Sequence, residues 1–145
     1  MTGNGSTARV VVGIDGSPSS QAALRWAVQQ AALLGATVDV VGAWEATPLF
    51  AGPTVVDPTL EAETARRRFD QEINEVLGDA RPVEVHEQLV RGNPADVLLA
   101  AADGADLLVV GSRGHGTFAR ALLGSVSTRC AMHASCPVVI VRPPS

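Results

Sequence analysis

Residues 106–128 read DLLVVGSRGHGTFARALLGSVST. The aliphatic residues 107–110 have the length and composition of a buried strand. Glycines follow at once, and a Gly-Ser pair then opens a stretch of helical character. Glycines at the end of a strand let backbone N–H groups approach a ligand, and the free N–H groups at the start of a helix favour an anion. The stretch therefore predicts a phosphate cradle formed by Gly111, Gly114, Gly116, Gly124 and Ser125.

The rest of the chain alternates between short aliphatic runs and longer segments of helical spacing. The aliphatic runs predict strands at residues 9–14, 37–43, 82–90, 107–110 and 138–141. A Ser-Pro, Asp-Pro or Asn-Pro pair opens each of three predicted helices, because the first residue can cap the helix and proline suits its first position. The first of these helices ends at Gly35 and carries an apolar stripe of Leu24, Ala27, Ala31 and Leu34. Strands that alternate with helices predict an α/β fold, a parallel sheet with helices on both faces.

Length and composition exclude several classes of protein. The chain has 145 residues, the size of one domain, and we expect residues 1–8 to be a flexible tail and residues 9–145 the domain. Its net charge is −4 and its longest basic run is residues 66–68, which argues against a nucleic-acid surface. No apolar run approaches the ~20 residues of a membrane span. The first eight residues lack the features of a secretory signal, and Cys130 and Cys136 fit a reduced, cytoplasmic protein.

Three familiar enzyme motifs are missing from the sequence. No lysine follows a glycine loop, so a Walker A site is excluded. Residues 114–119 fit G-x-G-x-x-A, but they follow the fourth strand and no acidic residue lies about 20 positions later, which excludes an NAD site of that type. There is no G-x-S-x-G nucleophile elbow. We therefore assign no catalytic residue.

The spacing Gly111-x-x-Gly114, nine residues, Gly124-Ser125 resembles the nucleotide-binding signature of ATP-binding universal stress proteins. Residues 11–17, VVGIDGS, resemble the first strand and turn of that family, and residues 133–141, HASCPVVIV, resemble its last strand. The resemblance implies a single-domain Rossmann-like fold of the adenine nucleotide alpha hydrolase-like type, with strand order 3-2-1-4-5. In that order strands 1 and 4 are neighbours whose connections leave in opposite directions, so a ligand crevice is expected at Asp15 and Gly111.

The resemblance also implies a ligand, ATP with magnesium, and a role for individual residues. Gly111 and Gly114 would pass under the ribose and phosphates, and Gly124, Ser125 and Val126 would contact phosphate, with Ser127 as a candidate hydroxyl donor. The backbone of Gly13 and Ile14 would face the ligand, and Ala43 would contact adenine through its main chain. The full candidate set is Gly13, Ile14, Asp15, Ala43, Val110, Gly111, Arg113, Gly114, His115, Gly116, Arg120, Gly124, Ser125, Val126 and Ser127.

Several of these residues have two interpretations. Asp15 either bonds its own turn or contacts the ribose or the magnesium ion. Arg113 and Arg120 either bind phosphate or face solvent, and His115 has no carboxylate near it in the sequence to support acid–base chemistry. Trp44 and Phe50 either cover the base by stacking or pack on the core or on a partner subunit.

The interpretation that unites these features is an ATP-binding stress-response sensor or regulator. One rival is a slow ATPase or a self-phosphorylating enzyme that uses Ser125, Ser127 or Thr128 as acceptor. Others are an AMP- or cyclic-nucleotide-binding protein and an interaction module without a nucleotide. The resemblance further implies a homodimer that pairs through the edge strand Val138, Val139, Ile140 and Val141, which would cover an otherwise adhesive edge.

Overall fold

A computed structural model of the protein describes residues 7–46, 57–113 and 123–144. Strands and helices alternate along these residues, as predicted from the sequence. The elements are β1 (Arg9–Gly13), α1 (Pro18–Leu34), β2 (Thr37–Trp44), α2 (Pro58–Leu77), β3 (Val85–Arg91), α3 (Pro94–Ala101), β4 (Leu107–Gly111), α4 (Ser125–His133) and β5 (Val138–Val141).

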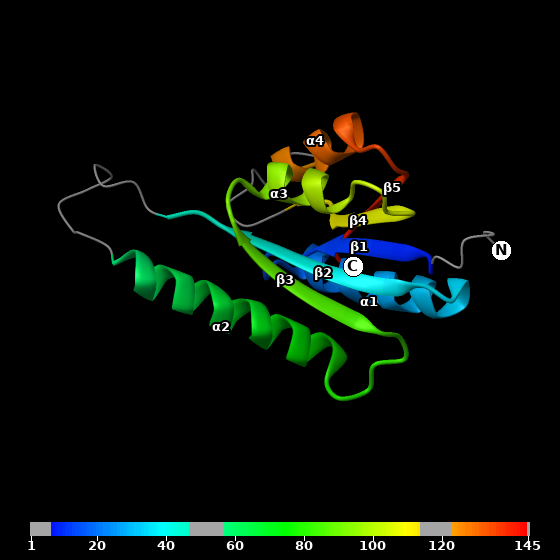
Figure 1. Ribbon diagram of the computed structural model, residues 1–145, viewed down its shortest axis with the longest axis horizontal. Helices are drawn as coiled ribbons and strands as arrows, with labels where there is room; N and C mark the ends of the chain where they lie inside the picture. Colours follow the sequence, from blue (N-terminus) through cyan, green and yellow to red (C-terminus); the bar gives the residue numbers. More distant parts are fainter. Residues whose placement is uncertain (1–6, 47–56, 114–122, 145) are drawn as a thin grey trace.

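The strands form one parallel sheet in the order β3-β2-β1-β4-β5, which confirms the predicted order. β1 occupies the centre, where Val10 pairs with Val38 of β2 and with Leu107 of β4. In Figure 1, α3 and α4 lie together on one face of the sheet, and α1 and α2 lie on the other. The predicted three-layer arrangement is thus the observed one.

The core consists of two clusters, one on each face of the sheet. Alternate residues of β1 divide between them, because successive side chains of a strand point to opposite faces. Val10 and Val12 pack with Leu24 of α1 and Ile73 of α2. Val11 packs in the second cluster, against α3 and α4.

The helix boundaries follow the capping signals in the sequence. Ser17 accepts a hydrogen bond from the N–H of Ser20 at the start of α1, and Asn93 accepts two at the start of α3. The first residue of each of these helices is proline, as the Ser-Pro and Asn-Pro pairs predict. Gly35 ends α1 in the left-handed conformation, with φ 67°.

Two predictions about the elements were wrong in detail. β3 begins at Val85 rather than at residue 82, because Pro82 has no N–H to donate and the ladder with β2 starts only where Val38 donates to Glu84. Leu34 is 60% exposed rather than buried with the apolar stripe of α1. A helix of 17 residues spans about 25 Å, whereas the five residues of β1 span about 17 Å, so the last turn of α1 extends past the sheet.

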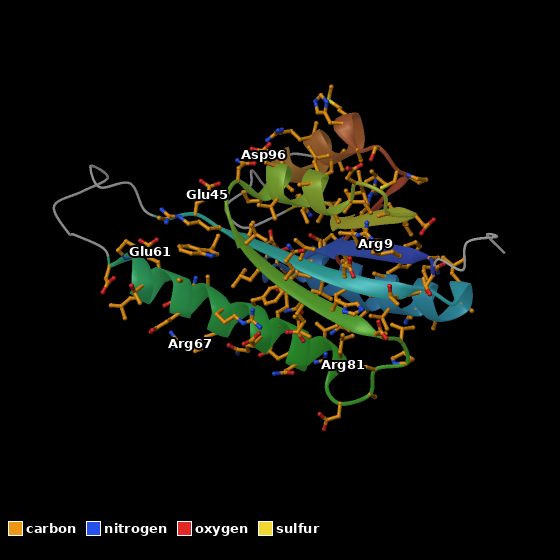
Figure 2. The ribbon with its side chains drawn as sticks, in the orientation of Figure 1. Arg9, Glu45, Glu61, Arg67, Arg81 and Asp96 are labelled. Atoms are coloured by element: carbon orange, nitrogen blue, oxygen red, sulfur yellow. The ribbon has the colours of Figure 1, made fainter. Side chains whose placement is uncertain are left out.

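One arginine connects several elements at the end of the sheet where the strands begin (Figure 2). The guanidinium of Arg9 donates to Asp39 Oδ2 at 2.9 Å and to the carbonyl oxygens of Ala101 and Asp103 at 3.0 and 2.9 Å. Its backbone N–H donates to Asp106 Oδ2 at 2.8 Å. Arg9 therefore joins β1 to β2 and to the end of α3.

No helix among the described residues is long and apolar enough to cross a bilayer. Cys130 is fully buried in the second cluster and Cys136 is partly buried, and both are free thiols. Burial raises the pKa of the Cys130 thiol from its ordinary 9.0 to about 11, although the Arg129 charge opposes the shift. Burial also raises the pKa of Cys136.

We expect the free energy of unfolding to fall as the pH rises from 9 to 11. Above pH 9 the unfolded chain releases the Cys130 proton while the folded chain keeps it, which favours unfolding by up to roughly 2–3 kcal/mol at about 1.4 kcal/mol per pKa unit. The chain has no lysine and no tyrosine, so the thiols dominate titration in this window. Urea denaturation at pH 8.5 and 10.5 measures the difference. Cys130→Ala should remove most of it, and an equal pH dependence in that variant would contradict the assignment.

Candidate functional site

A pocket of about 250 Å³ lies at the carboxyl ends of β1 and β4. Because β1 and β4 are neighbours whose following helices pack on opposite faces, this is the switch point of the sheet, where parallel α/β folds place their ligands. Topology and the glycine pattern thus converge on one position, as the sequence predicts.

Eleven of the fifteen candidate residues line this pocket: Gly13, Ile14, Asp15, Ala43, Val110, Gly111, Arg113, Gly124, Ser125, Val126 and Ser127. The other four, Gly114, His115, Gly116 and Arg120, lie outside the described residues. The structure therefore brings together all of the candidates that it describes.

Five lining residues were missed by the sequence analysis: Ser17, Ser20, Val41, Pro94 and Leu98. Ser17 was recognised only as a helix cap. Pro94 and Leu98 come from the start of α3, whose position beside β1 and β2 is a consequence of the packing rather than of any local motif. No sequence signal marks them as part of a site.

The N-terminus of α4 faces this pocket without a side-chain cap. Its N-cap is Gly124, which has no side chain to accept a hydrogen bond from the first turn. In α1 and α3 the side chains of Ser17 and Asn93 accept such bonds. Thr128 donates the first backbone hydrogen bond of the helix, to Gly124, so the N–H groups of residues 125–127 have no intrahelical acceptor. These donors and the helix dipole create a local environment that favours an anion.

The hydroxyl of Ser127 is engaged within the protein. It lies 3.1 Å from the carbonyl oxygen of Ser112 and 3.0 Å from that of Gly124, and Ser127 is 2% exposed. The N–H of Gly124 also donates to Ser112, at 2.7 Å. In this arrangement Ser127 fixes the first turn of α4 to the exit of β4, and its backbone N–H is the group left for a ligand.

Asp15 forms a turn at the end of β1. Its Oδ1 accepts hydrogen bonds from the N–H of Ser17 at 3.0 Å and from the Ser17 hydroxyl at 2.6 Å. The turn interpretation of Asp15 is therefore observed, and the side chain is also exposed on the wall of the pocket. Among the described residues there is no group of three His, Cys, Asp or Glu that could hold a metal ion.

The glycines that end β1 and β4 allow helices to pack closely. A Cβ on Gly111 would lie 2.5 Å from the Ser19 hydroxyl and 2.8–2.9 Å from backbone atoms of Ser19 and Ser20. The three atoms nearest to a Cβ on Gly13 would all belong to the Leu98 side chain, at 2.6–3.2 Å. Gly111 thus has a structural function at the start of α1 in addition to its position in the pocket.

A second recess, of about 620 Å³, shares Ile14, Asp15 and Ala43 with the first and extends towards α2. Trp44 lines this second recess, with the Arg91 guanidinium 5.5 Å from the centroid of its ring. Among the described residues Trp44 thus lines the second recess and not the first pocket, and Phe50 lies outside the described residues.

The universal stress protein family model matches residues 7–142, almost the whole chain. The chain belongs to the universal stress protein family. It is 36% identical over 142 residues to a universal stress protein of Mycolicibacterium smegmatis, covering 91% of this chain and 47% of that one. The chain spans about half the length of the curated relatives it matches.

Solved universal stress proteins share the fold. A crystal structure of a universal stress protein in complex with cAMP is 33% identical, with a TM-score of 0.71, and the match covers 95% of this chain and 98% of that one. The universal stress protein UspA from Lactobacillus plantarum is 23% identical, with a TM-score of 0.72 and coverage of 93% and 97%. The second similarity bears on the fold alone.

Proposed function

We propose that this universal stress protein binds an adenine nucleotide at the carboxyl ends of β1 and β4, and that it acts as a nucleotide-dependent regulator with ATP and magnesium as its ligands. The observation that carries the proposal is the N-terminus of α4. Three backbone N–H groups without intrahelical acceptors line the same pocket as the ends of both strands. A phosphate group suits these donors, and Ala43, which lines the same pocket, would contact the base through its main chain.

A cyclic nucleotide is the second candidate ligand, favoured by the similarity to the universal stress protein in complex with cAMP. The two ligands differ in phosphate charge and in their dependence on magnesium. ATP carries three linear phosphates whose charge a magnesium ion neutralises, whereas cAMP carries one cyclic phosphate.

The described residues of the pocket could hold a magnesium ion only if the phosphates supplied further ligands, because they include a single carboxylate. Asp15 is the carboxylate on the wall of the pocket, and one of its oxygens already accepts two hydrogen bonds from Ser17. A single carboxylate together with phosphate oxygens is a usual arrangement for magnesium in nucleotide sites. Asp15 would then hold the ion through its second oxygen or through water.

The direct experiment identifies what the purified protein carries and what it binds. The protein is denatured, its small molecules are identified by mass spectrometry, and the nucleotide-free protein is titrated calorimetrically with ATP, ADP, AMP and cAMP, with and without magnesium. We expect micromolar binding of ATP that magnesium strengthens. Tighter binding of cAMP, unaffected by magnesium, would favour the second candidate. Failure to bind any of the four would overturn the proposal.

We also propose that the protein forms a homodimer through β5. This strand pairs with β4 on one side, and its other edge pairs with no strand among the described residues. All four residues of β5 are partly exposed; Val138 and Ile140 pack against the second core cluster, whereas Val139 belongs to neither cluster. An open, aliphatic edge of this kind invites pairing with a second copy.

Val139→Arg is expected to shift the protein from dimer to monomer in sedimentation velocity, because a twofold axis near β5 would bring the two new charges close together. Leu33→Arg, at a residue that is 79% exposed on α1, is the matched control and should leave the dimer intact. A monomeric unmodified protein at micromolar concentration would contradict the proposal.

A further inference from the structure

We propose that Ser19 is a positioning residue that fixes the backbone of Arg113 at the exit of β4, beside the pocket, and thereby sets the affinity for the phosphates of the ligand. The effect on affinity rests on the proposed nucleotide binding. Ser19, Ser17 and the backbone of Arg113 are here called the serine clamp.

The clamp holds the backbone of Arg113 through both its carbonyl oxygen and its N–H. The Ser19 hydroxyl donates to the carbonyl oxygen of Arg113 at 2.6 Å and accepts from the N–H of the same residue at 3.3 Å. The Ser17 hydroxyl lies 3.1 Å from that carbonyl oxygen and 2.6 Å from Asp15 Oδ1. Because Ser17 has a single proton and a shorter contact with Asp15, Ser19 is the principal donor to Arg113.

The clamp joins two distant parts of the chain at the site. Ser19 and Arg113 are 94 residues apart in sequence. Ser19 lies in the first turn of α1, directly after the turn that carries Asp15, and Arg113 is the residue before Gly114. The hydrogen bonds therefore fix the backbone of Arg113, just after β4, relative to the turn at the end of β1.

Burial makes the clamp rigid and costly to break. Ser19 is 2% exposed and Arg113 is partly buried, so the loss of the Ser19 hydroxyl removes two hydrogen bonds that are largely shielded on the Ser19 side. The missing Cβ of Gly111 leaves room for the hydroxyl, since a Cβ there would lie 2.5 Å from Ser19 Oγ. The Ser19 hydroxyl therefore occupies space that is available only because residue 111 is glycine.

The neighbouring Ser20 provides a matched control. It is equally buried, but its hydroxyl accepts from the N–H of Asp15 at 2.9 Å and donates to Glu72 Oε2 at 2.6 Å. Ser20 therefore supports the turn after β1 and α2. Its removal tests the effect of losing a buried hydroxyl whose hydrogen bonds go to Asp15 and Glu72 rather than to Arg113.

The first test is amide hydrogen exchange measured by NMR on the nucleotide-free protein. In Ser19→Ala the N–H of Arg113 is expected to exchange about tenfold faster, because the hydrogen bond to the Ser19 hydroxyl is lost. The N–H of Ser112, which donates to Val141, should keep its rate. In Ser20→Ala the rate at Arg113 should stay that of the unmodified protein. An unchanged Arg113 rate in Ser19→Ala would overturn the clamp.

The second test compares nucleotides with different numbers of phosphates. Ser19→Ala should weaken ATP binding about tenfold, equivalent to roughly 1.4 kcal/mol, and AMP binding less than about twofold. Equal losses for ATP and AMP in Ser19→Ala would overturn the positioning role in favour of a general structural one. If the unmodified protein binds no nucleotide, the proposed function fails and the role in affinity fails with it, whereas the exchange result still decides whether the clamp exists.

Discussion

Gly124→Glu is expected to abolish nucleotide binding and to leave the circular dichroism spectrum unchanged. Gly124 is the N-cap of α4 and lies next to the N–H groups proposed to hold phosphate. A carboxylate there would compete for these donors and repel the phosphates, and two like charges about 4 Å apart cost several kcal/mol at the effective dielectric of a protein site. We expect the affinity for ATP to fall at least about 100-fold, measured by calorimetric titration.

The fold should tolerate this substitution. The backbone of Gly124 has φ −77° and ψ 170°, an extended conformation that any residue adopts, and acidic residues are favourable at helix N-termini. Gly124→Gln, which has nearly the same size without the charge, is the control and should lose much less affinity. Normal ATP binding by Gly124→Glu would show that the cradle assignment is wrong.

Gly111→Ala is expected to destabilise the protein by roughly 2–4 kcal/mol, more than a typical overpacking substitution. The added Cβ would lie 2.8 Å from the carbonyl carbon of Ser19 and 2.9 Å from the nitrogen of Ser20. These are backbone atoms of the first turn of α1, which cannot rotate away as a side chain can. The free energy of unfolding in urea measures the loss.

Gly13→Ala is the matched control at the end of the neighbouring strand. The atoms nearest to its Cβ would be Cδ1, Cδ2 and Cγ of Leu98, a side chain that can change rotamer, so we expect a loss of at most about 1–2 kcal/mol. A larger loss for Gly13→Ala than for Gly111→Ala would show that α1 moves more easily than α3, contrary to the packing described above.

The sequence predicted the features that depend on local pattern. The aliphatic runs indicated five strands, the Ser-Pro, Asp-Pro and Asn-Pro pairs located three helix starts, and the glycine spacing indicated the pocket. Contacts between residues far apart in sequence could not be predicted in this way. Ser19 and Arg113 are 94 residues apart, and their hydrogen bond joins a hydroxyl to a backbone carbonyl oxygen. Both groups are common in every chain, so no local pattern indicates which of them meet.

Other differences have equally physical origins. Leu34 has the helical spacing of a buried residue, but burial also depends on how far the sheet extends beneath the helix. For Asp15 the sequence left two interpretations open. The structure shows the contacts with Ser17, and the ligand role of the remaining oxygen stays a prediction that magnesium-dependent binding would test.

The hydrogen bonds of Arg9 and the pocket lie at opposite ends of the sheet. The hydrogen bonds hold β1, β2 and the end of α3 together where the strands begin, whereas the pocket lies where the strands finish. One end of the sheet holds the elements together, and the other end carries the pocket. We therefore expect that substitutions in the loops around the pocket can change the ligand preference without breaking the hydrogen bonds of Arg9.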